Sequence, residues 1–298
     1  MSERRRETWR QTAIFHGYRA MAWFGRHLPE AIGRRIYTRL GILAFHLMPS
    51  VRGTVAGNQA RVLGRPADDP LVRASTREAF ARYARYWFDT FAVLNLTDEE
   101  LGRRHVVDGR EHMDEALAKG RGVILALPHM GNWDVSGRWV SSTGNRIVSV
   151  AETLEPQRLS DLFLRHRRDL GMDIIGLSEG GVGQQLAADL AENAVVALVA
   201  DRDLTGRGVE VEMFGATRRI PAGPALLSIS TGAALIVVAV YETREGWRCV
   251  MSKPIEVPPS GDRREDVRAL TRLMAAGFER GIASSPPDWH LFQPGWPS

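Results

Sequence analysis

The sequence predicts an α/β protein: a single domain whose central mixed β-sheet is flanked by helices, with an aromatic and basic helical region at the N-terminus. Two observations support this. From residue 123 onward, apolar runs of strand length alternate with amphipathic segments of helical length. The 298 residues, 44% hydrophobic, can also form one large core, and no long Pro- or Gly-rich linker divides them. We expect one domain over residues 1–298, with its α/β core at 120–255.

The first 50 residues should form two helices in which aromatic and apolar side chains are interleaved with arginines. In the first helix these are Trp9, Ile14, Phe15, Tyr18, Met21, Trp23 and Phe24 beside Arg4, Arg5, Arg6, Arg10, Arg19 and Arg26. The second combines Ile36, Leu40, Leu43, Phe45 and Leu47 with Arg34, Arg35 and Arg39. Such a pattern suits helices that lie in an anionic membrane surface. It equally suits amphipathic helices packed on a core, and the sequence leaves both interpretations open.

Residues 57–96 continue as helices with a break at 66–70. An aromatic stripe at helical spacing there, Phe80, Tyr83, Trp87, Phe88 and Phe91, is more typical of a core than of a ligand groove. The acidic cluster of Glu111, His112, Asp114 and Glu115 matches no recognised metal-ligand spacing. We interpret it as a solvated helix start and expect no metal.

Strands and helices then alternate at spacings that suit βαβ units. The predicted strands are 123–127, 147–151, 172–177, 194–200, 209–213, 234–241 and 247–252, the last antiparallel to its predecessor. The predicted helices are 158–170, 182–191, 223–230 and 266–281, and a tail rich in Pro and Trp follows.

The segment VILALPHMGNWD, residues 123–134, carries the leading candidate site. A buried strand ends at Leu127, and Pro128 and Gly131 break it so that His129 lies just beyond the strand's carboxyl end. Ligands of open α/β sheets bind at that edge. Histidine is a potential base near neutral pH, and Asp134 could orient it if the chain turns between them. A histidine that merely caps a helix is the structural alternative.

A second strand, 194–200, delivers Asp201, Arg202 and Asp203 to the same predicted edge. Two carboxylates flanking an arginine are costly to bury unless they are paired, so they form an ion-pair network or part of a site.

A different chemistry is suggested by Gly176-Leu177-Ser178-Glu179-Gly180, which matches the G-x-S-x-G turn of serine hydrolases. Asp201 or Asp203 and His290 follow in hydrolase order. The match is weak, because 29 glycines produce such a pattern easily by chance and the strand before it is short.

Composition indicates the kind of partner and the cellular compartment. The formal charge of +4 favours a phosphate-bearing or anionic-surface partner. A single cysteine, Cys249, excludes an internal disulfide and fits a reducing compartment. The N-terminus lacks a secretory signal pattern, and no apolar run is long enough to span a bilayer. We therefore expect any membrane contact to be made from the cytoplasmic surface.

Four blocks in order make the chain resemble the bacterial acyltransferase superfamily that includes the lipid A late acyltransferases. They are LPHMGNWD, VAETLEPQRLSDLFLRHRRDLG, VALVADRDLTGRGVEVEMFG and RRIPAGPALLSISTGAALIVV. Within that superfamily, these blocks resemble the actinobacterial phosphatidylinositol mannoside acyltransferases, and the resemblance extends from the N-terminal helices to DWHLFQPGW.

The resemblance implies roles for individual residues. His129 would be the base and Asp134 the acid of the motif. Asp201 stands where the relatives carry a glutamate that holds the histidine, so a shorter side chain could lengthen that contact or transfer it to Asp134. Glu152, Arg167, Arg202 and Arg207 would bind substrate, with Arg167 and Arg207 anchoring the donor's phosphates or carbonyl. A structural Glu152–Arg167 pair is the alternative.

The implied reaction moves a fatty acyl group, expected to be palmitoyl, from acyl-CoA to a mannose hydroxyl of phosphatidylinositol mannoside without a covalent intermediate. Backbone N–H groups around Gly131 and Asn132 are the suggested oxyanion donors. The resemblance implies the acyl-CoA co-substrate, a glycolipid acceptor, the cytoplasmic face of the plasma membrane, and neither cofactor nor nucleic acid. Three alternatives stay open: a lipid A type acyltransferase, a serine esterase using Ser178, and a non-catalytic lipid-binding protein.

Overall fold

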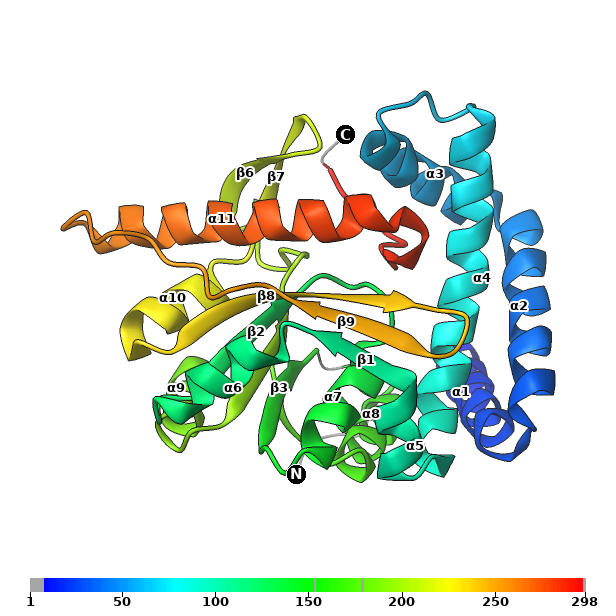
Figure 1. The fold of residues 1–298 in the computed structure, drawn as a ribbon. Helices are drawn as coiled ribbons and strands as arrows, with labels where there is room; N and C mark the ends of the chain where they lie inside the picture. Colours follow the sequence, from blue (N-terminus) through cyan, green and yellow to red (C-terminus); the bar gives the residue numbers. More distant parts are fainter. Residues whose placement is uncertain (1–7, 153, 178–179, 297–298) are drawn as a thin grey trace.

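A computed structural model describes residues 8–152, 154–177 and 180–296. Its centre is a seven-stranded mixed sheet with the strand order β1-β9-β8-β2-β5-β3-β4 (Figure 1). The strands of this sheet are β1 (His105–Asp108), β2 (Val123–Leu127), β3 (Ile147–Ala151), β4 (Met172–Gly176), β5 (Val195–Val199), β8 (Ala234–Glu242) and β9 (Trp247–Met251). A separate hairpin consists of β6 (Val209–Met213) and β7 (Ala216–Ile220). The predicted single-domain α/β fold with a mixed sheet is confirmed.

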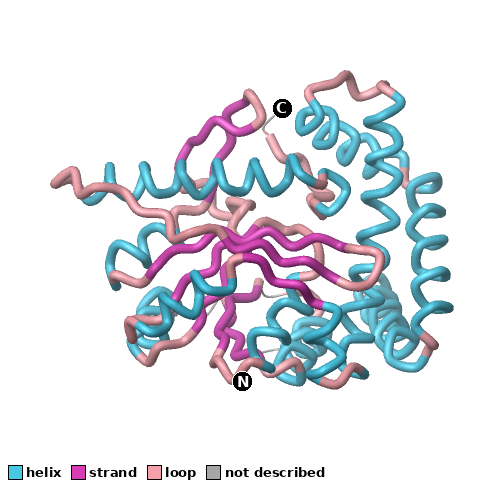
Figure 2. The backbone as a smooth tube through the Cα atoms, viewed as in Figure 1, coloured by secondary structure: helices cyan, strands magenta, loops and turns pink. Residues whose placement is uncertain are grey.

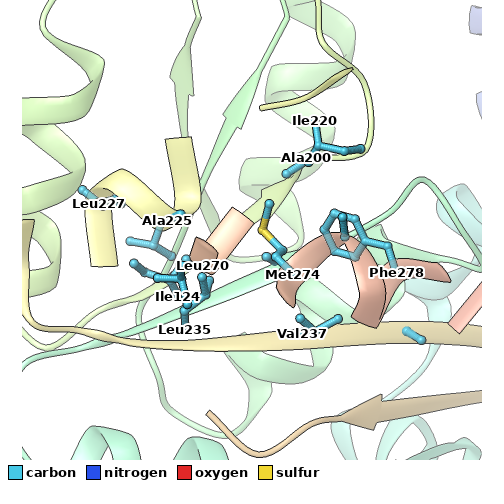
Figure 3. Packing of buried hydrophobic residues seen from close by; sticks show 14 of the residues in the cluster. Ile124, Ala200, Ile220, Ala225, Leu227, Leu235, Val237, Leu270, Met274 and Phe278 are labelled. Carbon is cyan, nitrogen blue, oxygen red and sulfur yellow. The ribbon is translucent and has the colours of Figure 1, made fainter. Parts of the chain in front are cut away.

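Helices cover both faces of this sheet (Figure 2). Side chains from α9 (Val182–Ala191), α10 (Gly223–Thr231) and α11 (Arg263–Ser284) form one apolar core with the sheet. On the opposite face, the core includes side chains from α5 (Asp98–Arg104), α6 (Arg110–Ala118) and α7 (Trp133–Ser142). Figure 3 shows how Leu270, Met274 and Phe278 of α11 lie over the buried Leu235 and Val237 of β8.

The register of the parallel strands sets the position of the site. β8, β2, β5, β3 and β4 are parallel neighbours, whereas β9 runs antiparallel to β8. Leu127, the last residue of β2, pairs with Val199, the last residue of β5. Two residues further on, His129 and Asp201 therefore leave the sheet side by side at its carboxyl edge.

Every strand and helix predicted from residue 123 onward is present and in the predicted order, but helix α7, strand β7 and, further upstream, strand β1 were not predicted. Its four residues, HVVD, form an edge strand beside β9 and directly follow the short helix α5. A run this short and half polar carries no clear alternation. The predicted helix start around Glu111 is α6, where Arg110 forms an ion pair with Asp114.

The first third of the chain forms a layer of helices at one end of the sheet (Figure 1). These are α1 (Trp9–His27), α2 (Glu30–Leu47), α3 (Pro49–Leu63) and α4 (Pro70–Ala92), with the predicted break between α3 and α4. α2 and α4 pack closely because two glycines of α2 face α4. A Cβ at Gly33 would lie 2.1 Å from the Phe88 ring, and one at Gly41 would lie 2.4 Å from the Phe80 carbonyl oxygen.

The aromatic stripe of α4 divides between two environments. Phe80, Phe88 and Phe91 are buried in the core, as predicted. Tyr83 and Trp87 instead line the large cavity described below, so the interpretation of the stripe as core does not hold for these two.

The outer faces of α1 and α2 carry exposed apolar side chains. They are Trp9, Ile14, Trp23, Phe24, Ile32, Ile36, Leu40, Leu43 and Leu47, followed by Met48. We call the α2 members of this set, Ile32 to Leu47, the apolar stripe. Arg4, Arg5 and Arg6, which the sequence analysis assigned to the first helix, lie outside the described residues. In the part of the chain that the structure describes, no helix is long and apolar enough to cross a bilayer.

Candidate active site

His129 and Asp201 form the centre of the site. The Nδ1 atom of the His129 ring is hydrogen-bonded to Asp201 Oδ1, and the His129 backbone N–H donates to the same oxygen over 3.1 Å. The Asp201 carboxylate is fully buried, whereas the His129 side chain is 21% exposed. Despite its shorter side chain, Asp201 thus contacts the histidine directly, and the contact does not pass to Asp134.

The surroundings of Asp201 favour its ionised form. Burial alone would raise the pKa of its carboxyl, but the hydrogen bond and charge of His129 and the Trp289 indole hold the pKa below its usual range. The Trp289 N–H donates to Oδ2 over 2.8 Å. Because an ionised carboxylate can only accept, Nδ1 of His129 must carry a proton. In the neutral form of the ring, Nε2 is then the nitrogen that can accept a proton.

The turn after His129 is fixed by two residues. Gly131 has φ +57°, and a Cβ there would lie 2.2 Å from the Val240 carbonyl oxygen, so a larger residue does not fit. The Asn132 side chain caps α7 by accepting from the Val135 N–H. The Gly131 N–H already donates to the Asp288 carbonyl oxygen over 2.9 Å. Its suggested part in binding the oxyanion was therefore wrong.

The C-terminal segment holds the other side of this turn, which sequence reasoning missed. The backbone N–H of His290 donates to the His129 carbonyl oxygen over 2.7 Å, and Met130 forms an isolated bridge with Trp289. Asp288, which is buried, accepts a hydrogen bond from Arg82 of α4 over 2.6 Å. The only signal in the sequence was that the family resemblance extends through DWHLFQPGW.

Asp134 does not orient the histidine in this structure. Its carboxylate is buried, with Oδ1 accepting from Arg167 Nε over 2.8 Å and Oδ2 from the Tyr86 hydroxyl over 2.7 Å. Burial would raise the pKa of Asp134, but the Arg167 guanidinium outweighs this and lowers it. Asp134 thus joins α7 to α4 and to α8 (Gln157–Asp169).

The other predicted substrate-binding residues lie at the mouth of the site. Glu152, just beyond β3, is exposed and pairs with Arg202 over 3.0 Å, so the alternative Glu152–Arg167 pair is not formed. The Arg202 Nε atom is buried and has no partner within the described part of the chain. Arg207 is exposed, and Asp203 holds its loop by accepting from the backbone N–H groups of Thr205, Gly206 and Gly208.

The two arginines should therefore respond differently to substitution. Arg167→Met leaves the buried Asp134 carboxylate unpaired, and we expect a loss of about 3–5 kcal/mol in unfolding free energy. Arg202→Met removes a half-buried group that lines the cavity, so stability should change by less than about 1 kcal/mol while the KM for substrate rises. Urea unfolding and steady-state kinetics of both variants measure this. Equal stability losses would contradict the assignment.

A cavity of about 1000 Å³ adjoins His129. Aromatic side chains from α4 and α7, apolar side chains from the sheet, and the arginines above line it. Its lining includes Tyr83, Trp87, Leu125, Leu127, Trp133, Asp134, Trp139, Val140, Ile147, Glu152, Arg167, Met172, Ala197, Val199, Arg202, Arg207, Leu226 and Met251. The cavity thus combines a mostly apolar lining with charged side chains and the His129 ring, which suits a ligand with an aliphatic part and a charged part.

The described residues do not support the serine hydrolase alternative. Ser178 and Glu179 lie outside the described residues. Asp201, its first candidate acid, is bonded to His129. His290 is buried, and burial lowers its pKa to about 3. Among the described residues, no group of three or more His, Cys, Asp or Glu side chains could hold a metal ion.

Comparison with known proteins identifies the family. The family model described as bacterial lipid A biosynthesis acyltransferase matches residues 4–298. This chain belongs to that family. Among its relatives, a phosphatidylinositol mannoside acyltransferase of Mycobacterium tuberculosis is 39% identical over 287 residues, covering 93% of this chain and 87% of the relative. One of Mycolicibacterium smegmatis is 41% identical over 245 residues, covering 80% and 77%. This family member is an acyltransferase.

Proposed function

We propose that this acyltransferase moves a fatty acyl group from acyl-CoA to a mannose hydroxyl of phosphatidylinositol mannoside, with His129 as general base. The single observation that carries the proposal is the His129 ring, fixed through Nδ1 by the buried Asp201 at the mouth of the large apolar cavity. The acceptor is supported by the relatives, which are phosphatidylinositol mannoside acyltransferases.

The proposed step uses the two substrates, His129 as the base and Asp201 as its partner. Nε2 accepts the hydroxyl proton while the sugar oxygen forms a bond to the thioester carbonyl carbon. The tetrahedral intermediate then expels CoA by breaking the carbon–sulfur bond, and the proton on Nε2 passes to the departing sulfur. Asp201 stabilises the imidazolium between these steps, and no bond forms between protein and acyl group.

The cavity supports the assignment of the aliphatic part. Between α7 and the sheet it is lined by Leu125, Trp139, Val140, Ile147 and Met172, all buried apolar residues. An acyl chain in this space would place its thioester near His129. This supports a long chain such as palmitoyl in the donor.

The mouth of the cavity supports the assignment of the polar part. Arg202 has an unpartnered buried Nε, and the exposed Arg207 lies in the loop beside it. Both can donate to the carbonyl or phosphates of the CoA donor. Arg167 is a weaker candidate than the sequence suggested, because its Nε is engaged by Asp134.

The exposed apolar residues of α1 and α2 support contact with a membrane. Trp, Phe and Leu side chains beside arginines are typical of helices that insert shallowly into an anionic leaflet. We propose that these helices hold the enzyme peripherally on the cytoplasmic side of the plasma membrane, where its lipid acceptor resides.

A test of the function compares acceptors in one assay. Purified enzyme with radiolabelled palmitoyl-CoA is offered phosphatidylinositol mannoside, a lipid A precursor, or no acceptor, and lipid products are separated. We expect transfer to the mannoside and only slow hydrolysis without acceptor. Preferred transfer to the lipid A precursor would replace the proposed acceptor. Membrane binding without turnover on any acceptor would favour a lipid-binding protein.

A further inference from the structure

A second cavity lies apart from the site. It measures about 640 Å³ and is formed by α2, α4 and the turn between β8 and β9. Its lining is Arg34, Arg35, Thr38, Arg39, Ile42, Arg82, Arg85, Glu242, Thr243 and Arg244. No lining residue is shared with the first cavity. The lining thus contains six arginines and one carboxylate, Glu242, while the carboxylates of Asp89, Asp288 and Glu78 pair with some of these arginines from outside the lining.

Three of these arginines are held in place by carboxylates. Arg34 pairs with Asp89 over 2.7 Å, and Arg85 pairs with Glu242 over the same distance. Arg82 pairs with the buried Asp288 over 2.6 Å. These pairs build a rigid floor for the cavity from three separate parts of the chain.

The other three arginines are exposed at its rim. For Arg35, Arg39 and Arg244, the structure gives no side-chain hydrogen bond or ion pair to any described residue. Their charges are therefore not compensated locally. A guanidinium presents donors in a planar fork that matches the oxygens of a phosphate group.

The rim also borders the apolar stripe. At 100° per residue, Arg35 and Arg39 lie on α2 between the cavity side, marked by Thr38, and the stripe side, marked by Ile36 and Leu40. A surface that contacts the stripe therefore brings its polar groups to the rim arginines. A membrane offers both an apolar layer for the stripe and, next to it, anionic lipid headgroups for these arginines.

We propose that this cavity binds the phosphate group of an anionic phospholipid headgroup. The proposal rests on membrane contact by α1 and α2, and it adds a headgroup site distinct from the acyl-transfer site. Binding there would orient the enzyme on the leaflet through the same α4 helix whose other residues, Tyr83 and Trp87, line the first cavity.

The test measures vesicle binding of full-length protein by co-sedimentation. Vesicles of phosphatidylcholine are compared with vesicles that also contain phosphatidylinositol. The variant Arg35→Lys/Arg39→Lys/Arg244→Lys keeps the charge and removes the fork. The variant Arg121→Gln/Lys253→Gln/Arg264→Gln removes three exposed cations from outside the second cavity and is the control.

We expect wild type to bind the phosphatidylinositol vesicles at least about tenfold more tightly than the lysine variant, and the control to bind like wild type. Lysine-variant binding equal to wild type would overturn the site, because nonspecific attraction would explain it. A control loss as large as the lysine variant's would also overturn it.

Two further arms separate sources of phosphate and separate this inference from the proposed function. Soluble glycerophosphoinositol should compete with wild-type vesicle binding, whereas inorganic phosphate at equal concentration should compete less. Equal competition would mean that the cavity is a site for free phosphate and not for a lipid headgroup.

Ile36→Ser/Leu40→Ser should weaken binding to all vesicles. Unchanged binding of that variant would contradict membrane contact by α2, and with it the headgroup site, while leaving acyl transfer in detergent unaffected.

Discussion

His129→Ala is expected to lower kcat for acyl transfer by about 10²–10⁴-fold, because no other group replaces the base that accepts the hydroxyl proton. Binding of acyl-CoA should change little, since the ring contributes only a small part of the cavity lining. Transfer of radiolabelled palmitate under saturating substrates measures the effect, with circular dichroism to verify folding.

His112→Ala on α6 is a matched control, because this histidine does not line the cavity. It should retain wild-type kcat. If His129→Ala kept more than about a tenth of wild-type kcat, the ring would be a structural cap rather than the base, and the proposed step would fail.

Asp201→Asn is expected to have the second largest effect, a fall of about 10²-fold or more in kcat with a smaller change in KM. The carboxylate accepts from three N–H groups, two of His129 and one of Trp289. An amide offers one oxygen and a nitrogen that donates, so it cannot accept all three, and the ring loses its tautomer or its orientation.

Trp289→Phe provides an intermediate case, because it removes one donor to Asp201 and retains most of the ring. We expect a loss of kcat smaller than that of Asp201→Asn. Asp203→Asn is the control at the same strand end, since within the described residues Asp203 accepts hydrogen bonds only from its own loop. Equal loss in Asp201→Asn and Asp203→Asn would indicate a general disturbance of this edge instead of a specific partnership with His129.

The sequence was sufficient to predict which residues meet at the candidate site. Apolar runs marked β2 and β5 as buried strands, and parallel strands with a common register must present His129 and Asp201 at one edge. The sequence could not decide between Asp134 and Asp201 as the partner of the histidine. That choice depends on Arg167 and Tyr86, which engage Asp134 from distant helices and leave Asp201 to the ring.

The C-terminal part of the site was beyond local pattern reasoning. Trp289 donates to a carboxylate that is 88 positions away in the chain, and nothing in a Pro- and Trp-rich tail indicates such a contact. Strand β1 was not predicted for a different reason. An edge strand of four residues is stabilised by its neighbour β9 and not by its own composition.

The most direct test of the central claim asks whether an acyl group is ever bonded to the protein. Wild-type enzyme is incubated with palmitoyl-CoA without acceptor, quenched in acid, and examined by intact-protein mass spectrometry, with a parallel sample that receives phosphatidylinositol mannoside. Direct transfer by His129 predicts an unmodified protein mass in both samples and acylated lipid only in the second. The claim of direct transfer would be contradicted by a palmitoylated protein that loses its palmitoyl group when acceptor is added and that does not form in Ser178→Ala.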